Sequence, residues 1–314
     1  MRKFNLAIIG CGKIAYFHAE AFLKSGFLIT HCASSMNSKS IKSFANKFKI
    51  KNIFNNPNDL LKTHNEWDVV LISVPIEKNS IYLNKIIKLN KVCLIEKPLS
   101  FNLDYLKKIN KYNNKLIRVA YNRRFYPTIQ NALNFIKRKK KVFLKLDLPE
   151  IVKDKDNFYR VKANSAHGID LINYFFNDLK IINIIKFPYS NGRKVIFRSN
   201  EGSIIDLTMN WNSPANFMMQ IESFGERLEL KPFESSVQYQ GMKVLEPSKD
   251  FPLRRYFPKE KFIINSFNKK NIDIKPGFFE QAMEIKQILK GKKPKISASV
   301  KDALIVQRII SKIL

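Results

Sequence analysis

The chain has 314 residues, with 56 Lys or Arg, 26 Asp or Glu and four His, so its net charge is +30 with the His neutral. This length predicts two domains, and ten Gly and 13 Pro exclude a collagen-like or low-complexity chain. Three Cys without a CxxC spacing exclude a disulfide scaffold and favour a cytoplasmic, reducing compartment, and no apolar run approaches the roughly 20 residues of a membrane-spanning helix.

In the first 121 residues, short apolar runs alternate with stretches of helical periodicity. We expect strands at 4–9, 27–33, 67–74, 92–95 and 116–121, and helices at 13–25, 38–48, 81–89 and 103–110. The run at 67–74 is almost continuously apolar, as in parallel strands that are covered on both faces. The alternation predicts an α/β Rossmann domain over residues 1–121, with a doubly wound parallel sheet.

The pattern changes after residue 121. We expect helices at 128–137, 166–176, 278–289 and 300–313, and strands at 142–148, 181–187, 195–198, 203–210, 218–223 and 227–230. Consecutive strands separated by short turns predict antiparallel pairing. Residues 122–314 are therefore expected to form an α+β domain with a largely antiparallel open sheet.

The segment from Gly10 to Ala15 joins the first expected strand to the first expected helix. Gly10 allows a tight turn, Gly12 lets the backbone approach a pyrophosphate, and the helix that opens at Lys13 and Ile14 offers N–H groups to that anion. In this strand–turn–helix context we predict a dinucleotide site; the alternative is a plain tight turn.

The end of the second expected strand bears on the choice of cofactor. NAD enzymes commonly place a carboxylate there, which binds the ribose 2′-hydroxyl. This chain has Ser34 and Ser35, followed by Lys39, and these hydroxyls and the cation suit a 2′-phosphate. We expect NADP or NAD, with NADP favoured; the alternative is that serine binds the 2′-hydroxyl directly.

Glu96, Lys97 and Pro98 directly follow the fourth expected strand. Ligands of open parallel sheets bind at the carboxyl ends of the strands. Lys97 is thus expected beside the nicotinamide, where it can donate a proton or a hydrogen bond to a substrate oxygen. The alternative is a surface ion pair between Glu96 and Lys97.

Several motifs together resemble the glucose–fructose oxidoreductase / inositol dehydrogenase / rhizopine-catabolism (Gfo/Idh/MocA) family. They are the glycine turn with His18 downstream, Leu71–Pro75, Glu96–Ser100, Tyr121–Pro127 and Gly277–Gln281. The resemblance implies an NAD(P)-dependent dehydrogenase or reductase, which acts on the CH–OH group of a sugar, cyclitol or nucleotide sugar. It also implies that Ser73, Val74, Pro75 and Glu96 line the cofactor site, and that the C-terminal sheet packs against a second copy.

The segment from His167 to Asp170 resembles the histidine-bearing helix of that family. Asn164 or Ser165 is expected to cap this helix, so that the helix dipole keeps His167 neutral and able to accept a proton. Asp170 lies on the same face. The alternative for His167 is a packed histidine near the cap.

Three further residues complete the expected site and its surroundings. Asn122 and Arg124, together with Asp170, are the candidates for substrate contacts. His18 is expected to pack under the first helix rather than to take part in catalysis.

The chain departs from the family at three positions, one of which is Ser35, at the acidic cofactor position of the family. The family usually has Asp four residues before the histidine, where this chain has Ala163, and often has His at the position of Asn79. An alternative function is therefore a catalytically degenerate, cofactor-binding regulatory or scaffold protein. Metal catalysis has no support, because the His and Cys show no ligand spacing.

The high charge admits a third interpretation, a basic nucleic-acid binder. The lysines are scattered, and the densest block is 137–141, without a zinc finger or RNP motif. We therefore favour a solvated basic surface and a small-molecule substrate, with no nucleic acid or membrane as partner.

Overall fold

The computed structural model describes residues 3–36, 38–112, 115–151, 158–188, 192–266 and 274–314. The chain forms two compact units: residues 1–125 with 269–311 (unit 1), and residues 126–268 with 312–314 (unit 2). This division differs from the expected one, which had a single boundary after residue 121. The chain returns to unit 1 near its end, because Phe278, Ala282 and Ile285 complete the hydrophobic core there.

Unit 1 contains a six-stranded parallel sheet with the strand order β3-β2-β1-β4-β5-β6. Its strands are β1 (Asn5–Ile9), β2 (Leu28–Ala33), β3 (Asn52–Phe54), β4 (Val69–Ile72), β5 (Val92–Ile95) and β6 (Ile117–Val119). The order reverses beside β1, between β1 and β4, which is the place where open α/β sheets bind ligands. The predicted Rossmann architecture is confirmed.

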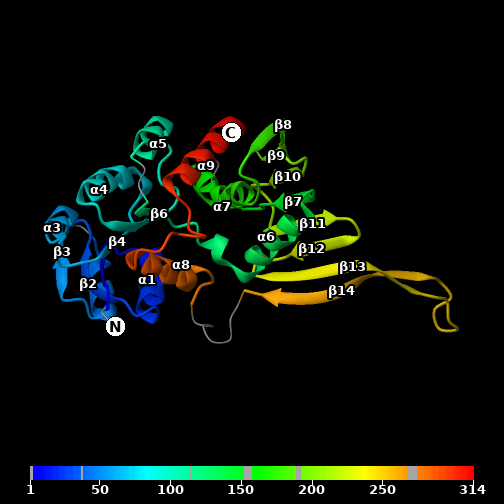
Figure 1. Cartoon of the computed structure of the whole chain (residues 1–314), viewed down its shortest axis with the longest axis horizontal. Helices are drawn as coiled ribbons and strands as arrows, with labels where there is room; N and C mark the ends of the chain where they lie inside the picture. Colours follow the sequence, from blue (N-terminus) through cyan, green and yellow to red (C-terminus); the bar gives the residue numbers. More distant parts are fainter. Residues whose placement is uncertain (1–2, 37, 113–114, 152–157, 189–191, 267–273) are drawn as a thin grey trace. The chain divides into compact units, whose positions relative to one another are not determined.

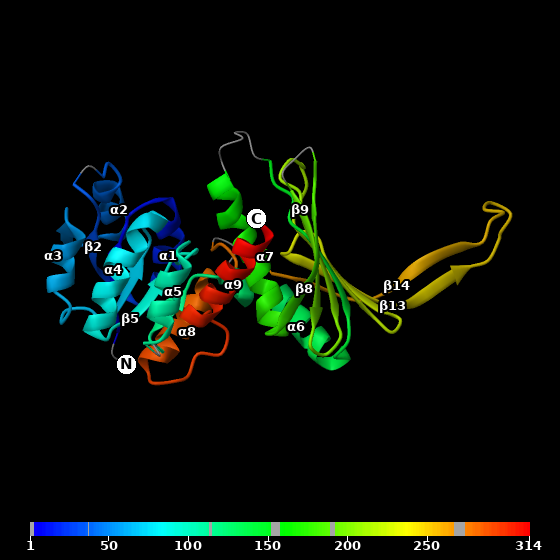
Figure 2. The ribbon, with the colours of Figure 1, turned by 90° about the horizontal axis from the view of Figure 1, so that it is seen from above.

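Helices cover both faces of this sheet (Figures 1 and 2). They are α1 (Lys13–Lys24), α2 (Ile41–Phe48), α3 (Pro57–Lys62), α4 (Ile76–Leu89), α5 (Leu103–Asn110) and α8 (Phe278–Leu289); α9 (Val300–Ile313) follows. Leu6 and Ile8 pack in one cluster with α1, α2 and α8, whereas their neighbours Ala7 and Ile9 are buried on the other side. Burial on both sides explains the continuous apolar runs.

Three short elements of unit 1 were not expected from the sequence: β3, α3 and a 3₁₀ helix, η1 (Asn122–Phe125). The sequence does contain a helix-start signal for α3, at Asn56 and Pro57. Asn56 accepts a hydrogen bond from the backbone N–H of Asn58, and Pro57 occupies the first helical position. The expected helix at 81–89 begins earlier, at Ile76.

Unit 2 contains an eight-stranded sheet with the order β14-β13-β12-β11-β7-β10-β9-β8. The strands are β7 (Phe143–Asp147), β8 (Leu179–Lys186), β9 (Arg193–Ser199), β10 (Ile204–Met209), β11 (Met218–Ser223), β12 (Glu226–Leu230), β13 (Ser235–Leu245) and β14 (Arg255–Asn265). Among the strands of this sheet that the structure describes, only β7 and β10 pair in parallel. The predicted, largely antiparallel sheet is confirmed.

The helices of unit 2, α6 (Pro127–Lys139) and α7 (Phe158–Phe176), lie on one face of this sheet (Figure 2). Along β7, Leu144 and Leu146 are buried, whereas Lys145 and Asp147 alternate with them and are half-exposed. We call the side that carries Lys145 and Asp147 the open face. Among the described residues, no helix is long and apolar enough to cross a membrane.

Helix α7 begins at Phe158, eight residues before the expected start. Neither Asn164 nor Ser165 is therefore the cap, and that prediction is wrong. Both residues often occur at caps, but inside α7 the Ser165 hydroxyl accepts a hydrogen bond from Trp211 Nε1 (3.3 Å). This tertiary contact offsets the weak helix propensity of Ser165.

Strands β13 and β14 were not expected, and they form a long hairpin that continues past the other strands (Figures 1 and 2). The pairing of β12 with β13 ends at Gln240, whereas β13 and β14 pair as far as Leu245 and Arg255. We call residues 242–258 the arm. Gly241 and Pro258 interrupt the strand pattern in the sequence, and Pro258 is tolerated because β14 is an edge strand.

Candidate functional site

The glycine turn joins the carboxyl ends of three strands in unit 1. Gly10 follows β1 with φ 95°, and a Cβ atom there would collide with the carbonyl oxygen of Ser73 after β4. The Gly10 N–H donates to the carbonyl of Ala33, the last residue of β2 (2.8 Å). Only glycine combines this conformation with such a close approach.

The next residues open α1 in a way that suits an anion. Gly12 is the N-cap residue and supplies no side-chain cap, and the first turn has no acidic residue. Gly12 is exposed, and a Cβ atom there would meet nothing within 4 Å. The predicted residues Lys13 and Ile14 lie in the first turn of α1. Lys13 is exposed and Ile14 is half-buried. The space and the N-terminal N–H groups of α1 fit the pyrophosphate of a dinucleotide.

Ser73 gives a second, independent sign of a ligand. Its Oγ is buried and has no hydrogen-bond partner among the described residues, which is uncommon for a buried hydroxyl. Ser73 lies against Gly10, whose Cβ position also approaches a methyl group of Val74. The predicted residues Ser73, Val74 and exposed Pro75 therefore lie at the glycine turn.

The residues expected near the ribose follow β2. The Ser34 N–H donates to the carbonyl of Phe54 (3.1 Å), and the Ser35 carbonyl accepts from the N–H of Ser38 (2.9 Å). Ser35 and Lys39 are exposed. No carboxylate lies between residues 34 and 40. Ser34, Ser35 and Lys39 thus follow the end of β2, and their contact with a ribose stays a prediction.

Lys97 lies in a turn directly after β5, which we call the Lys97 turn (residues 96–99). The Glu96 N–H donates to the carbonyl of Ile72, the last residue of β4 (2.9 Å). The Glu96 carboxylate accepts a hydrogen bond from the Lys97 N–H with Oε2 (3.1 Å). Glu96 and Lys97 are half-buried, and the Lys97–Pro98 peptide bond is cis.

His18 binds the other oxygen of the same carboxylate. Its Nε2 lies 2.6 Å from Glu96 Oε1, and its ring lies 4.6 Å from the ring of Phe278. The predicted burial of His18 is confirmed. Its bond to Glu96 was missed, because the two residues are 78 positions apart and no local pattern joins them.

Asn79, in α4, contacts the Lys97 turn through backbone carbonyls. Its Nδ2 donates to the carbonyls of Pro98 (3.2 Å) and Leu99 (3.3 Å) and lies 3.5 Å from that of Glu96. The side chain is buried. His18 therefore restrains the turn through the side chain of Glu96, and Asn79 restrains it through the backbone carbonyls.

The predicted substrate residues Asn122 and Arg124 lie in η1. Asn122 Nδ2 donates to the carbonyl of Pro276 (3.1 Å). Arg124 is buried and pairs with Asp302 (3.2 Å). Burial raises the pKa of Asp302, but Arg124 and the hydrogen bonds of Ser299 outweigh it and hold that pKa below its usual range. These partners favour a structural role for Arg124.

His167 and Asp170 lie in the middle of α7, in unit 2, and both are buried. The expected effect of a helix N-terminus on His167 does not apply there, since nine residues of α7 precede it. The spacing puts both side chains on one face of the helix, with Ala163 one turn earlier. Lys97 belongs to unit 1 and His167 to unit 2.

Within the described residues, no three His, Cys, Asp or Glu are grouped as metal ligands would be. The polar features of unit 1 instead gather at the carboxyl ends of β1, β4 and β5.

A parallel sheet with a glycine turn at its switch point, followed by a separate α+β unit, defines a two-domain dinucleotide-binding protein. Residues 4–121 match the model of the oxidoreductase family with an NAD-binding Rossmann fold. The resemblance of the sequence motifs to the Gfo/Idh/MocA family is thus confirmed over this domain, which matches the model of that family.

Solved structures share the fold of the whole chain. UDP-N-acetylglucosamine 3-dehydrogenase from Acidithiobacillus ferrooxidans is 14% identical with a TM-score of 0.76, and the match covers 100% of this chain and 97% of that one. A levoglucosan dehydrogenase in complex with NADH and L-sorbose is 14% identical, with a TM-score of 0.79 and coverage of 100% and 96%.

A dehydrogenase from Clostridium difficile is 18% identical to the chain, with a TM-score of 0.77 and coverage of 99% of both chains. No curated protein matches the chain in sequence.

Proposed function

We propose that this protein is an NAD(P)-dependent dehydrogenase or reductase that interconverts an alcohol and a ketone on a sugar, cyclitol or nucleotide sugar. The observation that carries the proposal is the Lys97 turn, which His18 and Asn79 restrain at the edge of the sheet that also bears the glycine turn. A restrained lysine beside a dinucleotide site suits proton transfer coupled to redox chemistry.

Residues of unit 1 hold the cofactor in this proposal. Gly10 and Gly12 make room for the pyrophosphate, the first turn of α1 binds it, and the buried Ser73 hydroxyl supplies a further polar contact. Ser35 and Lys39 receive the ribose and favour NADP over NAD. When bound, the nicotinamide accepts or supplies the hydride.

Lys97 is the proposed acid–base residue: its ammonium gives a proton to the substrate oxygen during reduction, and its amine takes that proton during oxidation. His167 is the second candidate for proton transfer, and Asn122 and Asp170 are candidates for substrate binding. The pairing of Arg124 with Asp302 makes it the weakest of the predicted substrate residues.

Two matched structures are named for dehydrogenation of a nucleotide sugar and of levoglucosan, which supports a carbohydrate as the substrate class. We also propose that the chain forms a homo-oligomer through the sheet of unit 2. The three cysteines are free and buried, which supports a reducing compartment such as the cytoplasm.

Substitution of Lys97 by Met tests the proposal. Wild-type protein is assayed with NADPH and NADH against a panel of keto sugars and nucleotide sugars. Lys97→Met is expected to lower kcat by about 100-fold or more and to leave cofactor affinity within a few-fold. Full turnover by the variant would remove Lys97 from proton transfer, and Lys107→Met, on exposed α5, is the matched control.

Ala163 favours a second candidate function, a cofactor-binding regulatory or scaffold protein. It lies one turn before His167 on α7, where the family usually has a carboxylate. Binding of NADPH or NADH without turnover of any substrate in the panel would support this alternative. Gain of turnover in Ala163→Asp would show that the missing carboxylate is the cause.

A further inference from the structure

Two of the three cysteines lie together at the glycine turn. Cys11 stands between Gly10 and Gly12, and Cys32 is the last residue but one of β2. The Cys11 Sγ lies 3.8 Å from the carbonyl oxygen of Ala33, the residue after Cys32. Both cysteines are buried in one core cluster of unit 1. A pair of thiols therefore adjoins the turn where the pyrophosphate is expected.

The two thiols interact with each other. The Cys11 thiol donates a hydrogen bond to the Cys32 sulfur, which raises the pKa of Cys11 and lowers the pKa of Cys32. The thiolate is the reactive form of cysteine, so Cys32 is the better nucleophile of the pair. Cys93, the third cysteine, lies in β5, and burial raises its pKa. The pair thus differs chemically from Cys93, although all three cysteines are buried.

The backbone of Cys32 is held more firmly than that of Cys11. Cys32 pairs with Ile8 of β1 and with Ile53 of β3, whereas Cys11 lies outside any strand or helix. A disulfide brings two sulfur atoms closer together than a hydrogen bond does. The movement that a disulfide requires therefore falls on Cys11 and on the adjoining Gly12. Gly12 is the N-cap residue of α1, so this movement displaces the N–H groups that suit the pyrophosphate.

The same turn is the exposed part of the chain beside the pair. Gly12 is exposed, and a Cβ atom there would meet nothing within 4 Å. The first turn of α1 contains no acidic residue. A helix N-terminus without such a charge stabilises a thiolate as well as a phosphate. A dinucleotide bound at this turn is therefore expected to cover Cys11 and to slow its oxidation.

We propose that Cys11 and Cys32 form a reversible disulfide under peroxide, and that this disulfide releases the dinucleotide from unit 1. The inference rests on the dinucleotide site of the proposed function and adds a regulation to it.

The chemistry balances with one hydrogen peroxide. The Cys32 sulfur attacks one peroxide oxygen and the O–O bond breaks, which gives the sulfenic acid of Cys32 and one water. The Cys11 sulfur then attacks the sulfur of Cys32, the S–O bond breaks, and the disulfide and a second water form. Two thiols are oxidised, and one peroxide is reduced to two waters.

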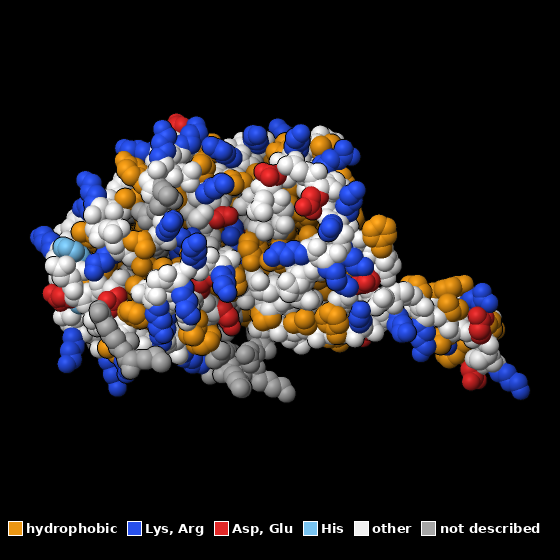
Figure 3. Space-filling model, viewed as in Figure 1, with side chains coloured by type: hydrophobic (Ala, Val, Ile, Leu, Met, Phe, Trp, Pro, Cys, Tyr) orange, Lys and Arg blue, Asp and Glu red, His pale blue; other side chains and the backbone are white. Residues whose placement is uncertain are grey.

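Titration of reduced and oxidised wild-type protein with NADPH tests the switch. The full-length protein is oxidised with hydrogen peroxide, an uncharged reagent that the Lys and Arg side chains of the surface do not concentrate (Figure 3). Catalase removes the peroxide, and fluorescence gives the affinity before and after dithiothreitol. We expect oxidation to weaken NADPH binding at least about tenfold, because charged hydrogen bonds to the pyrophosphate are lost. Dithiothreitol should restore the affinity, and NADPH present during the treatment should slow the oxidation.

Two cysteine variants and a mass measurement identify the bond. Trypsin cleaves after Lys and Arg, so Cys11 and Cys32 fall on separate peptides, residues 4–13 and 25–39, which the disulfide joins. Cys32→Ala is expected to bind NADPH like the reduced wild type and to lose its sensitivity to peroxide. Cys93→Ala is the matched control, since it removes a buried cysteine of the same sheet and should stay as sensitive as the wild type.

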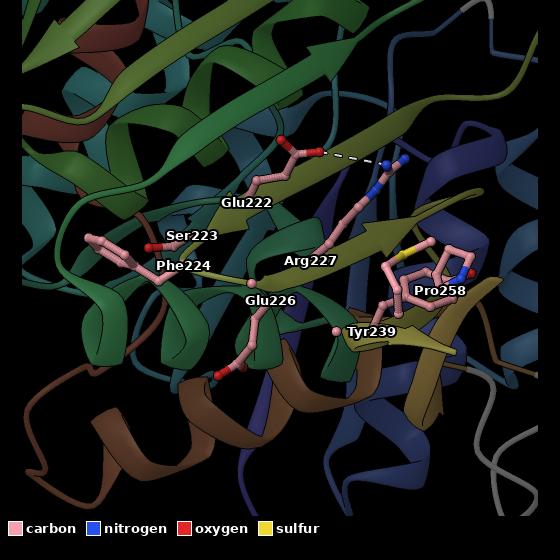
Figure 4. Close-up of a pocket in the computed structure, with 10 residues that line it drawn as sticks. Glu222, Ser223, Phe224, Glu226, Arg227, Tyr239 and Pro258 are labelled. Carbon is pink, nitrogen blue, oxygen red and sulfur yellow. Dashed lines mark ion pairs between the residues drawn. The ribbon is translucent and has the colours of Figure 1, made fainter. Parts of the chain in front are cut away.

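Exposed methionines are competing targets of peroxide. Met36, after β2, is 82% exposed, and Met242 is 56% exposed in a pocket that Tyr239 and Pro258 also line (Figure 4). Dithiothreitol reduces a disulfide, whereas a methionine sulfoxide requires its own reductases. A loss of affinity that dithiothreitol leaves in place and that Cys32→Ala shares would assign the effect to methionine and overturn the switch.

The remaining outcomes separate the switch from the proposed function. Peroxide that leaves Cys11 and Cys32 unlinked overturns the switch, and so does a disulfide that leaves the NADPH affinity unchanged. In both cases the dinucleotide site stands. Reduced wild-type protein that binds neither NADPH nor NADH overturns the proposed function together with the switch.

Discussion

At the scale of single residues, the best-defined feature is how Lys97 is restrained. One carboxylate, that of Glu96, accepts from the Lys97 backbone with one oxygen and binds His18 with the other. Asn79 fixes the carbonyls on the far side of the turn. A lysine that transfers a proton must be held within hydrogen-bond reach of the substrate, so the residues that fix its backbone affect catalysis without touching substrate.

His18 is therefore expected to be a positioning residue. His18→Ala releases the Glu96 carboxylate and is predicted to lower kcat about tenfold or more, since a hydrogen bond to a charged group is worth about 1.5–3 kcal/mol. His18→Gln retains a polar partner for Glu96 and should recover part of that loss. Steady-state kinetics provide the measurement, with KM for the cofactor expected to change little.

His31→Gln is the control for general destabilisation of unit 1. His31 is also buried and also pairs with a glutamate, Glu66 (3.0 Å), but it lies in β2. A loss of kcat as large as that of His18→Ala would show that the effect is not specific to the Lys97 turn.

We predict that cofactor choice depends on Ser35, which is exposed after β2. We predict that the wild type binds NADPH at least as well as NADH, and that Ser35→Asp reverses this order. A carboxylate repels the 2′-phosphate and accepts from a free 2′-hydroxyl, which commonly changes affinity by roughly tenfold to a hundredfold. Fluorescence titrations at fixed salt measure both affinities, because a highly basic surface attracts any anion. Strong preference of the wild type for NADH would mean that the serines bind the 2′-hydroxyl.

At the scale of secondary-structure elements, Glu226 ties α6 to the covered face of the unit 2 sheet. It begins β12, is 8% exposed, and binds Lys139 Nζ (2.8 Å) and Arg138 Nη2 (2.7 Å) of α6, and Gln238 Nε2 of β13 (2.8 Å). The hydrogen bond from Lys139, with Arg138, outweighs burial and lowers the pKa of Glu226 to about 2.

This pKa predicts acid sensitivity of unit 2. The unfolded chain takes up a proton on Glu226 near its ordinary pKa of about 4.3, whereas the folded chain resists until about pH 2. The contribution of Glu226 to the free energy of unfolding is thus complete above about pH 5 and is lost as the pH falls toward 2. Glu226→Gln should flatten the fall in stability over this range.

Urea unfolding at pH 3–7 measures this effect in a Trp67→Phe background. Trp211, in unit 2, is then the one remaining tryptophan and reports that unit alone. Glu222→Gln is the matched control, because Glu222 is half-exposed and its pair with Arg227 is longer (3.6 Å). An equal flattening in both variants would contradict the assignment to Glu226.

At the scale of the whole molecule, the chain builds unit 1 from two distant segments. Helix α8 follows residues 126–268 of unit 2 in the sequence, yet it supplies Phe278, Ala282 and Ile285 to the core that β1, α1 and α2 share. Unit 1 is therefore incomplete without residues that are synthesised after residues 126–268 of unit 2.

Phe278→Ala is predicted to lower the free energy of unfolding of unit 1 by about 3–5 kcal/mol, the usual cost of removing a buried ring. Phe278 is 3% exposed and packs on His18. Tyr112→Ala is the control, because the Tyr112 ring in unit 1 is 57% exposed. Its free energy of unfolding should stay within about 0.5 kcal/mol of the wild-type value. Urea unfolding with Trp67 as reporter, in a Trp211→Phe background, measures the stability of unit 1 in both variants. Equal stabilities would show that α8 does not complete the core.

The sequence was sufficient for the two fold classes, most of the elements of unit 1, the glycine turn and the position of Lys97 after β5. Each of these depends on periodicity or turn chemistry within a few residues. The tertiary structure decided four other features. They are the start of α7, the bonds of His18 and Asn79 to the Lys97 turn, the return of α8 to unit 1, and the arm. The physical reason is that these features depend on contacts between distant segments, such as the 78 positions between His18 and Glu96, or on an edge position that makes Pro258 acceptable within a strand.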